Sequence, residues 1–248
     1  MTEQKINTLL ALYQTERYVE AEKLSLSLTK DFPKHQLVWK VLALALKQNG
    51  KISEALIAIQ KSVQLEPRDS NAHHNLGFIL LELKRLDEAE VSFRKTIELK
   101  PDYTEAHNNL GVTLHLLGRF EEAETSYRKT IELKPDYADA HRNLGITLLD
   151  MGRLEEAMNS YTKAIELNPH SPWSLQDLTG LFTSYTPDEG FLHPVAKVNK
   201  EIKKNYLKDK TIGIISDDKI IKLFNQSTSI IEKYKLKTLQ EKYTSDLL

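Results

Sequence analysis

Three asparagines stand out in this sequence because they recur at one spacing and carry a versatile polar group. Asn75, Asn109 and Asn143 are 34 residues apart, within the segments AHHNLG, AHNNLG and AHRNLG. A side-chain amide offers both donors and an acceptor, so a row of amides could hold the backbone of an extended peptide. Asparagine is a poor helix former, so its presence in a helical pattern needs a reason. The alternative reasons are a hydrogen bond to the neighbouring repeat and simple duplication, because RKTIELKPDY occurs twice verbatim.

The residues around these asparagines suit a polypeptide ligand. The position before each asparagine is basic or polar, and further polar and apolar residues are expected on the same helix face. This mixture predicts a partly apolar groove. The candidate binding residues are Lys40, Asn71, His74, Asn75, Phe78, Asn108, Asn109, Val112, Arg142, Asn143 and Ile146.

Histidines recur at the same spacing and raise the question of a metal site. His73, His107 and His141 are separated by 34 residues each time, which places them on different helices. Metal sites on helices need histidines three or four residues apart, and the adjacent pair His73–His74 points apart. We therefore expect packing histidines and no metal site.

The sequence contains no recognisable catalytic constellation. It has no phosphate-binding glycine loop, no nucleophile elbow, no HExxH motif and no cysteine. The pairs Glu121–Glu122 and Glu155–Glu156 are expected in the first turns of helices, where solvated acids favour the helix dipole. The chain is therefore predicted to have no catalytic residues and no cofactor.

These candidate residues are positioned by a 34-residue repeat. The blocks are 2–35, 36–69, 70–103, 104–137 and 138–171. Each block carries two apolar stripes with i, i+3, i+4, i+7 spacing, and each stripe predicts an amphipathic helix of about 12–14 residues. Each block carries a proline two residues before its end, namely Pro33, Pro67, Pro101, Pro135 and Pro169. Proline disfavours helix at the residue before it, so these prolines are expected to end the second helices.

A glycine occupies the same position of three blocks. Glycine inside a helix costs about 1 kcal/mol relative to alanine. Gly77, Gly111 and Gly145 therefore predict places where two helices approach so closely that a β-carbon would clash. The alanines of the second helices (Ala89, Ala123 and Ala157) are interpreted in the same way.

The recurring Trp, Leu-Gly, Tyr, Ala and Pro positions resemble the tetratricopeptide repeat. The resemblance covers residues 2–171, with Trp39 at the tryptophan position of the second block. It implies an all-α fold, an α-solenoid of antiparallel helix pairs whose first helices line a concave binding face. The blocks are also similar to those of the O-linked N-acetylglucosamine transferase superhelix, which carries an asparagine ladder. The family's clamp for a C-terminal carboxylate is not expected, because Asp139 and Phe78 replace its Lys and Asn.

The repeat pattern fades after Pro169. Residues 172–184 keep a helical stripe and are predicted to form a capping helix. Residues 185–248 are predicted to be a linker and a basic helical tail, with 12 lysines against 7 acidic residues in 197–248. The segment 182–204 looks like one that follows such arrays in a group of bacterial proteins, which suggests a bacterial source.

Composition limits the location and the partners of the chain. The formal net charge of the whole chain is −1, which argues against nucleic acid or a membrane surface as the partner. The absence of cysteine fits a reducing, cytoplasmic compartment. No signal peptide and no apolar run of roughly 18 residues are visible.

These observations lead to a primary hypothesis and two others. The first is a non-catalytic scaffold that binds an extended peptide or a partner helix in the concave groove. The second is a targeting arm for a larger or separately supplied glycosyl- or sulfo-transferase. The third is self-association through the C-terminal region.

Overall fold

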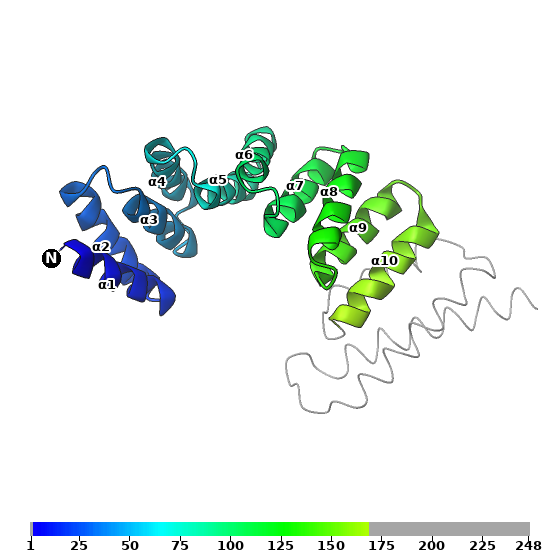
Figure 1. Cartoon of the computed structure of the whole chain (residues 1–248), viewed down its shortest axis with the longest axis horizontal. Coiled ribbons are helices and arrows are strands. Elements are labelled where there is room, and N and C mark those ends of the chain that lie inside the picture. Colours follow the sequence, from blue (N-terminus) through cyan, green and yellow to red (C-terminus); the bar gives the residue numbers. More distant parts are fainter. Residues whose placement is uncertain (1, 169–248) are drawn as a thin grey trace, which may run out of the picture. The chain divides into compact units, whose positions relative to one another are not determined.

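The computed structural model describes residues 2–168, and all of the regular secondary structure in this range is α-helical (Figure 1). This confirms the predicted all-α class. The helices are α1 (Thr2–Gln14), α2 (Tyr18–Asp31), α3 (Gln36–Gln48), α4 (Ile52–Leu65), α5 (Ser70–Glu82), α6 (Leu86–Leu99), α7 (Thr104–Leu116), α8 (Phe120–Leu133), α9 (Ala138–Asp150) and α10 (Leu154–Leu167). The predicted capping helix, the basic tail and the self-association surface lie outside the described residues.

The chain divides into two compact units, Met1–Leu133 and Lys134–Leu248, which we call unit 1 and unit 2. In unit 1, α3 packs on α4, α5 on α6 and α7 on α8, and α2, α4 and α6 also pack on α3, α5 and α7 respectively. The first helices touch one another as well, since α5 contacts both α3 and α7. In unit 2, α9 packs on α10 as one further pair.

The helix ends lie where the prolines and turn residues of the sequence predict them. The helices α5, α7 and α9 begin at Ser70, Thr104 and Ala138, each three residues after the proline near the end of the preceding block. Within each pair, the turn contains one residue with positive φ at the same repeat position. Three of these residues are glycines, whereas Glu16 (φ 59°) and Lys84 (φ 57°) adopt the same left-handed conformation at an energetic cost.

The core of each pair is built on the glycine position. A β-carbon on Gly77 would lie 2.7 Å from Cε1 of Phe93, and one on Gly111 would lie 2.6 Å from Cε1 of Tyr127. In unit 2, a β-carbon on Gly145 would lie 2.9 Å from the ring of Tyr161. The predicted close approach of helices is thus confirmed, and the partner in each case is an aromatic ring of the second helix.

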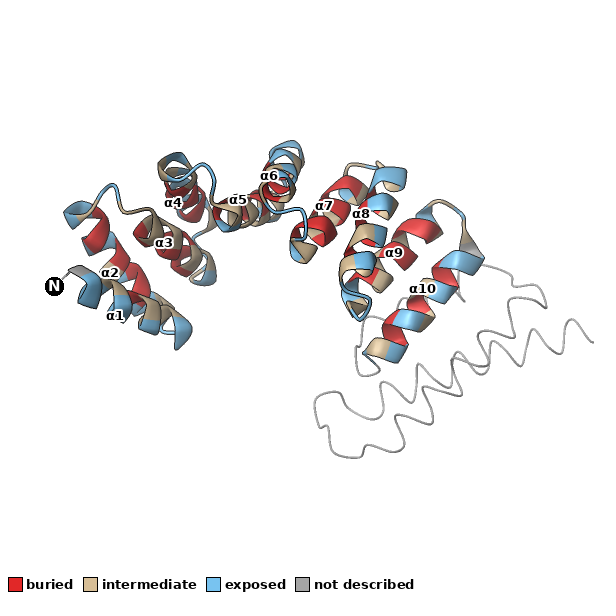
Figure 2. Ribbon diagram, viewed as in Figure 1, coloured by how far each residue is buried: buried red, intermediate tan, exposed pale blue. Residues whose placement is uncertain are grey.

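The side chains of this contact compensate one another in size along the repeats. The first-helix residues are Leu9, Ala43, Gly77, Gly111 and Gly145, and the second-helix residues at the matching positions are Ser25, Ile59, Phe93, Tyr127 and Tyr161. All ten are buried (Figure 2). The largest rings face glycine. The smallest second-helix side chain, Ser25, occupies the repeat position that matches Leu9. Most of the side-chain volume at this position therefore comes from the second helix in some repeats and from the first helix in others.

Gly111→Ala is expected to destabilise the protein by about 1–3 kcal/mol, because the new methyl group would overpack the ring of Tyr127. Tyr127→Ile is expected to destabilise it by leaving a cavity. The double variant recreates the Ala43–Ile59 combination, so its loss should fall short of the sum by about 0.5–3 kcal/mol. Urea unfolding of the four proteins measures this coupling, and strictly additive losses would contradict the packing account.

Candidate functional site

The candidate residues of unit 1 lie on one side of its first helices. Their positions along α5 and α7 are spaced at three, four and seven residues, which places them on a single helix face. We call this surface the first-helix face, and it comprises Lys40, Asn71, His74, Asn75, Phe78, Asn108, Asn109 and Val112. Asn71 is exposed, Asn108 is buried, and the other six are half-buried. The remaining candidates, Arg142, Asn143 and Ile146, are half-buried residues of α9 in unit 2.

Two of the recurring polar residues bond to each other across the repeats. Nδ2 of Asn109 on α7 lies 3.1 Å from Nε2 of His74 on α5. The ring of His74 stacks on Tyr103, with centroids 4.8 Å apart, and the Tyr103 hydroxyl donates to Oδ1 of Asn71 at 3.0 Å. The amide of Asn109 is therefore engaged with the neighbouring repeat, which is one of the alternatives considered from sequence.

The orientation of the Asn109 amide sets which nitrogen of the His74 imidazole is protonated. The amide nitrogen of asparagine can only donate, so Nε2 of His74 accepts and the ring carries its proton on Nδ1. Burial lowers the pKa of His74, the nearby charge of Lys47 lowers it further, and Glu105 opposes both effects. His74 is thus a neutral, partly buried histidine at the junction of two repeats.

Lys40 is held by an acid that also caps the next helix. Its Nζ lies 2.6 Å from Oδ2 of Asp69, which also accepts from Gln36 at 2.7 Å. The other carboxylate oxygen accepts from the backbone N–H of Asn71 and of Ala72, and this caps α5. Burial alone would raise the pKa of Asp69, but the hydrogen bond and the charge of Lys40 bring it below its ordinary value.

The apolar part of the first-helix face is partly covered by a cation. Nζ of Lys47 lies 3.9 Å from the centre of the Phe78 ring and 3.4 Å from Oε1 of Glu82. Such a cation over an aromatic face contributes about 0.5–1 kcal/mol at exposed sites. A ligand that packs on Phe78 therefore meets a positive charge beside an apolar surface.

Asn75 differs from Asn109 although both occupy the same repeat position. The side-chain amide of Asn75 forms no hydrogen bond with any residue in the described range 2–168. The residue as a whole is half-buried. Asn143 on α9 does take part in an interaction within the chain. Of the two recurring asparagines in unit 1, Asn75 is thus the one that forms no side-chain hydrogen bond to another described residue.

The recurring histidines tie each first helix to the proline before it. Nε2 of His73, His107 and His141 lies 2.9–3.0 Å from the carbonyl oxygen six residues earlier, that of Pro67, Pro101 and Pro135 respectively. Trp39 donates to the Pro33 carbonyl in the same way at 2.9 Å. Because a carbonyl only accepts, Nε2 donates in these histidines. This confirms the packing role, and the described residues include no group of three or more potential metal ligands.

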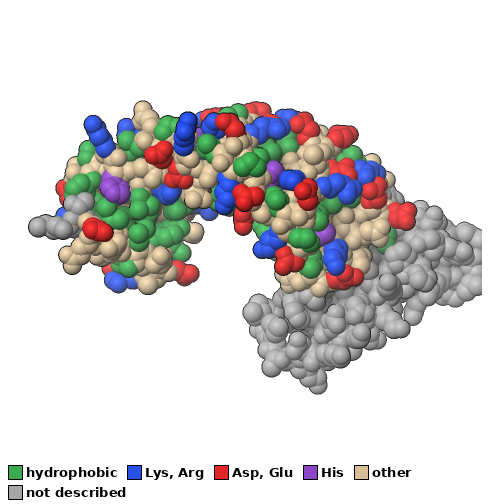
Figure 3. Space-filling model, viewed as in Figure 1, with side chains coloured by type: hydrophobic (Ala, Val, Ile, Leu, Met, Phe, Trp, Pro, Cys, Tyr) green, Lys and Arg blue, Asp and Glu red, His purple; other side chains and the backbone are tan. Residues whose placement is uncertain are grey.

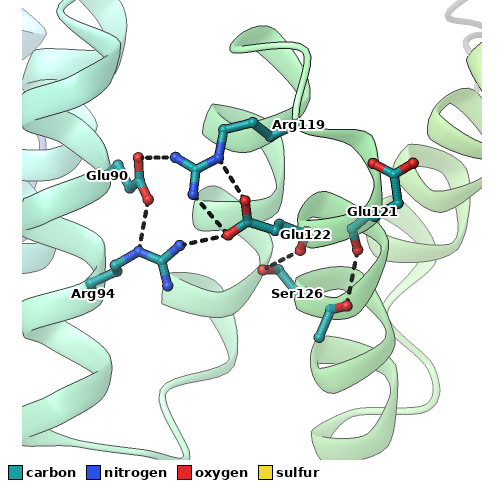
Figure 4. A network of polar contacts seen from close by, with 7 residues as sticks. Glu90, Arg94, Arg119, Glu121, Glu122 and Ser126 are labelled. Carbon is teal, nitrogen blue, oxygen red and sulfur yellow. Dashed lines mark hydrogen bonds and ion pairs between the residues drawn. The ribbon is translucent and has the colours of Figure 1, made fainter.

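An ion-pair network on the second helices was not anticipated from sequence (Figure 4). Glu90 bonds to Arg94 at 2.8 Å and to Arg119 at 2.6 Å, and Glu122 bonds to the same two arginines at 3.1 and 2.7 Å. Hydrogen bonding to Arg119 lowers the pKa of Glu122. Glu122 is an exposed acid in the first turn of α8, as predicted, and it also joins α8 to α6 through Arg94.

A similar ion pair, between Glu22 and Lys51 at 2.6 Å, links the first repeat to the second. Glu22 and Glu90 occupy the same position two repeats apart, as do Lys51 and Arg119. This matched spacing is the sequence signal that could have revealed the network. Figure 3 shows positive and negative side chains interspersed where α6 and α8 lie. Each of these carboxylates contacts a basic side chain of the neighbouring repeat, so the ion pairs link successive repeats.

The described helices are 13 or 14 residues long. A helix that crosses a bilayer needs roughly 20 apolar residues. None of the helices within residues 2–168 could therefore span a membrane.

One family model and several solved structures are similar to this chain. The tetratricopeptide-repeat family model matches residues 68–136 and again residues 102–169. The structure of a MamA protein is 21% identical, with a TM-score of 0.62 over 68% of this chain and 92% of that one. YrrB, described as a TPR protein with an unusual peptide-binding site, is 21% identical, with a TM-score of 0.62 over 70% and 90%. Residues 41 to the end of MamA from Desulfovibrio magneticus RS-1 give 19% identity and a TM-score of 0.64 over 69% and 97%. No curated protein matches the sequence.

His74→Gln is expected to flatten the pH dependence of stability on the acid side. In the unfolded chain a histidine has a pKa of about 6.5, whereas the fold holds His74 neutral. The unfolded state therefore takes up the proton first, and this contribution to the free energy of unfolding is lost as the pH falls below about 6.5. Glutamine can accept from Asn109 without titrating, so the variant removes this contribution.

Urea unfolding of the full chain between about pH 8 and about pH 5 measures this effect. The matched control is His73→Gln, on the neighbouring residue whose ring bonds to the Pro67 carbonyl, and it should keep the wild-type pH dependence. An identical pH dependence for His74→Gln and the wild type would show that His74 is not held neutral.

Proposed function

We propose that this chain, whose residues 68–169 match the tetratricopeptide-repeat family and whose described helices have the α-solenoid fold, is a non-catalytic scaffold. In this proposal it binds an extended peptide or a partner helix on its first-helix face. Its ligand is a polypeptide, and it acts without a cofactor of its own. The cysteine-free composition supports a reducing compartment, such as the bacterial cytoplasm, as its place of action.

The observation that carries this proposal is the half-buried amide of Asn75, which has no partner among the described residues. A polar group that is partly removed from water gains most from a ligand that completes its hydrogen bonds. A backbone peptide group offers one donor and one acceptor, which is the complement of an asparagine amide. Half-buried Phe78 lies one helical turn beyond Asn75, and Val112 occupies the equivalent position in the next repeat, so a peptide side chain can pack there.

The surroundings of Asn75 support the proposal because they are already fixed. Lys40 is paired with Asp69, Asn71 with Tyr103, and Asn109 with His74. A surface whose side chains are held before binding loses little conformational entropy when the ligand arrives. The peptide-binding site named for YrrB adds an analogy of fold, which raises the prior for a peptide ligand without identifying it.

The proposal is tested by affinity capture from a native lysate with the full chain as bait. Three baits are compared, namely the wild type, Asn75→Ala, and Gln60→Ala as a matched control. Gln60 is an exposed amide of α4, on a second helix. Equal helical circular dichroism of the three proteins is checked first.

Polypeptides bound by the wild type and by Gln60→Ala should be lost or weakened with Asn75→Ala. Overlapping synthetic peptides from the captured partner then give the affinity, which should fall about 2- to 10-fold for each neutral hydrogen bond removed. A partner that is kept by Asn75→Ala and lost by Gln60→Ala would move recognition to the second helices and end this proposal.

A further inference from the structure

The bond between His74 and Asn109 has a direction that only a neutral imidazole can accept. Asn109 donates through Nδ2 to Nε2 of His74 at 3.1 Å, while its Oδ1 accepts from Nδ2 of Asn108 at 3.4 Å. Both ends of the amide are thus assigned by their neighbours. A side-chain amide is nearly symmetric in shape, so it can rotate by 180° about its last bond without a change in packing.

Protonation of His74 would reverse the demand on this amide. A protonated imidazole donates from both nitrogens, so Nε2–H would face the Nδ2 donor of Asn109. Rotation of the amide relieves this conflict by turning Oδ1 toward His74. The rotated NH2 group then faces the NH2 group of Asn108, so the hydrogen bond between the two asparagines is lost.

The charges around His74 decide when this happens. Lys47 on α3 and Glu105 on α7 act on the ring with opposite signs, and Tyr103 stacks on it from the turn before α7. Phe93 on α6 also packs against the ring, at 5.8 Å between centroids, and brings no charge. Burial is the largest influence and favours the neutral ring, so the structure shows the arrangement that holds near neutral pH.

We propose that His74 is a pH-dependent latch that orients the Asn109 amide and thereby regulates the first-helix face. This inference rests on the proposed function, because the regulated surface is the one proposed to bind the peptide. Above the titration of His74 the face has a fixed pattern of donors and acceptors. Below it the Asn109 amide is reversed, so a peptide matched to the neutral pattern binds more weakly. His74 is a positioning residue in this account, since it acts through Asn109.

The test is nuclear magnetic resonance of the full chain without any peptide. At neutral pH the ring nitrogens of His74 should show an unprotonated Nε2 and a protonated Nδ1. The matched internal controls are His73, His107 and His141, which should show a protonated Nε2 because it donates to a proline carbonyl. As the pH is lowered, the side-chain amide resonances of Asn109 and Asn108 should shift together with the titration of His74.

Two variants make the outcome decisive. His74→Gln should abolish the pH-dependent shift of the Asn109 amide, whereas His73→Gln should leave it unchanged. A protonated Nε2 on His74 at neutral pH, or an Asn109 amide that does not follow the titration, would overturn the latch. Because no peptide is present, this failure is distinct from a failed capture experiment, which would remove the binding function and leave the tautomer of His74 as observed.

Discussion

The contact between a glycine of one helix and an aromatic ring of the next is the constraint on which the rest of this structure depends. It sets how closely the two helices of a pair can approach, and therefore how the pair presents its outer faces. Because interiors are packed at crystal-like density, each pair must fill the contact with nearly the same volume. The sequence does this with glycine opposite Tyr127. In the first pair, Leu9 and the small Ser25 are buried at the matching repeat positions. The first block thus follows the same rule with the sizes exchanged.

The regular packing of pairs has a functional consequence in unit 1. It brings α3, α5 and α7 next to one another, so that side chains of successive repeats can bond. His74 and Asn109 meet in this way, as do Lys40 and Asp69. A face assembled from such contacts is ordered before a ligand arrives. Asn75 is the exception, and its unengaged amide is where we place the ligand backbone.

Much of the fold could be predicted because it depends on local patterns. The helix lengths follow from apolar periodicity, the helix starts follow from the prolines, and the close approach follows from Gly77, Gly111 and Gly145. The site could be predicted only as a set of positions. An alignment of the repeats treats Asn75 and Asn109 as equivalent, because they occupy the same repeat position. The partner of Asn109 is His74, which occupies a different position of the preceding repeat. The network of Glu90 and Glu122 was missed for the same reason, since its arginines come from other positions of the repeat. Contacts between different repeat positions depend on the distances between helices, and the spacing of residues in the sequence does not give these distances.

The most direct test of the central claim, that the first-helix face binds a polypeptide, is site-specific photo-crosslinking. A photoreactive phenylalanine analogue replaces Phe78 in one protein and Val91, a side chain of α6 that is 69% exposed, in another. After irradiation in native lysate, the account predicts that position 78 crosslinks to a polypeptide and that position 91 does not. Crosslinking of the same partner through position 91, with none through position 78, would contradict the account and place recognition on the second helices.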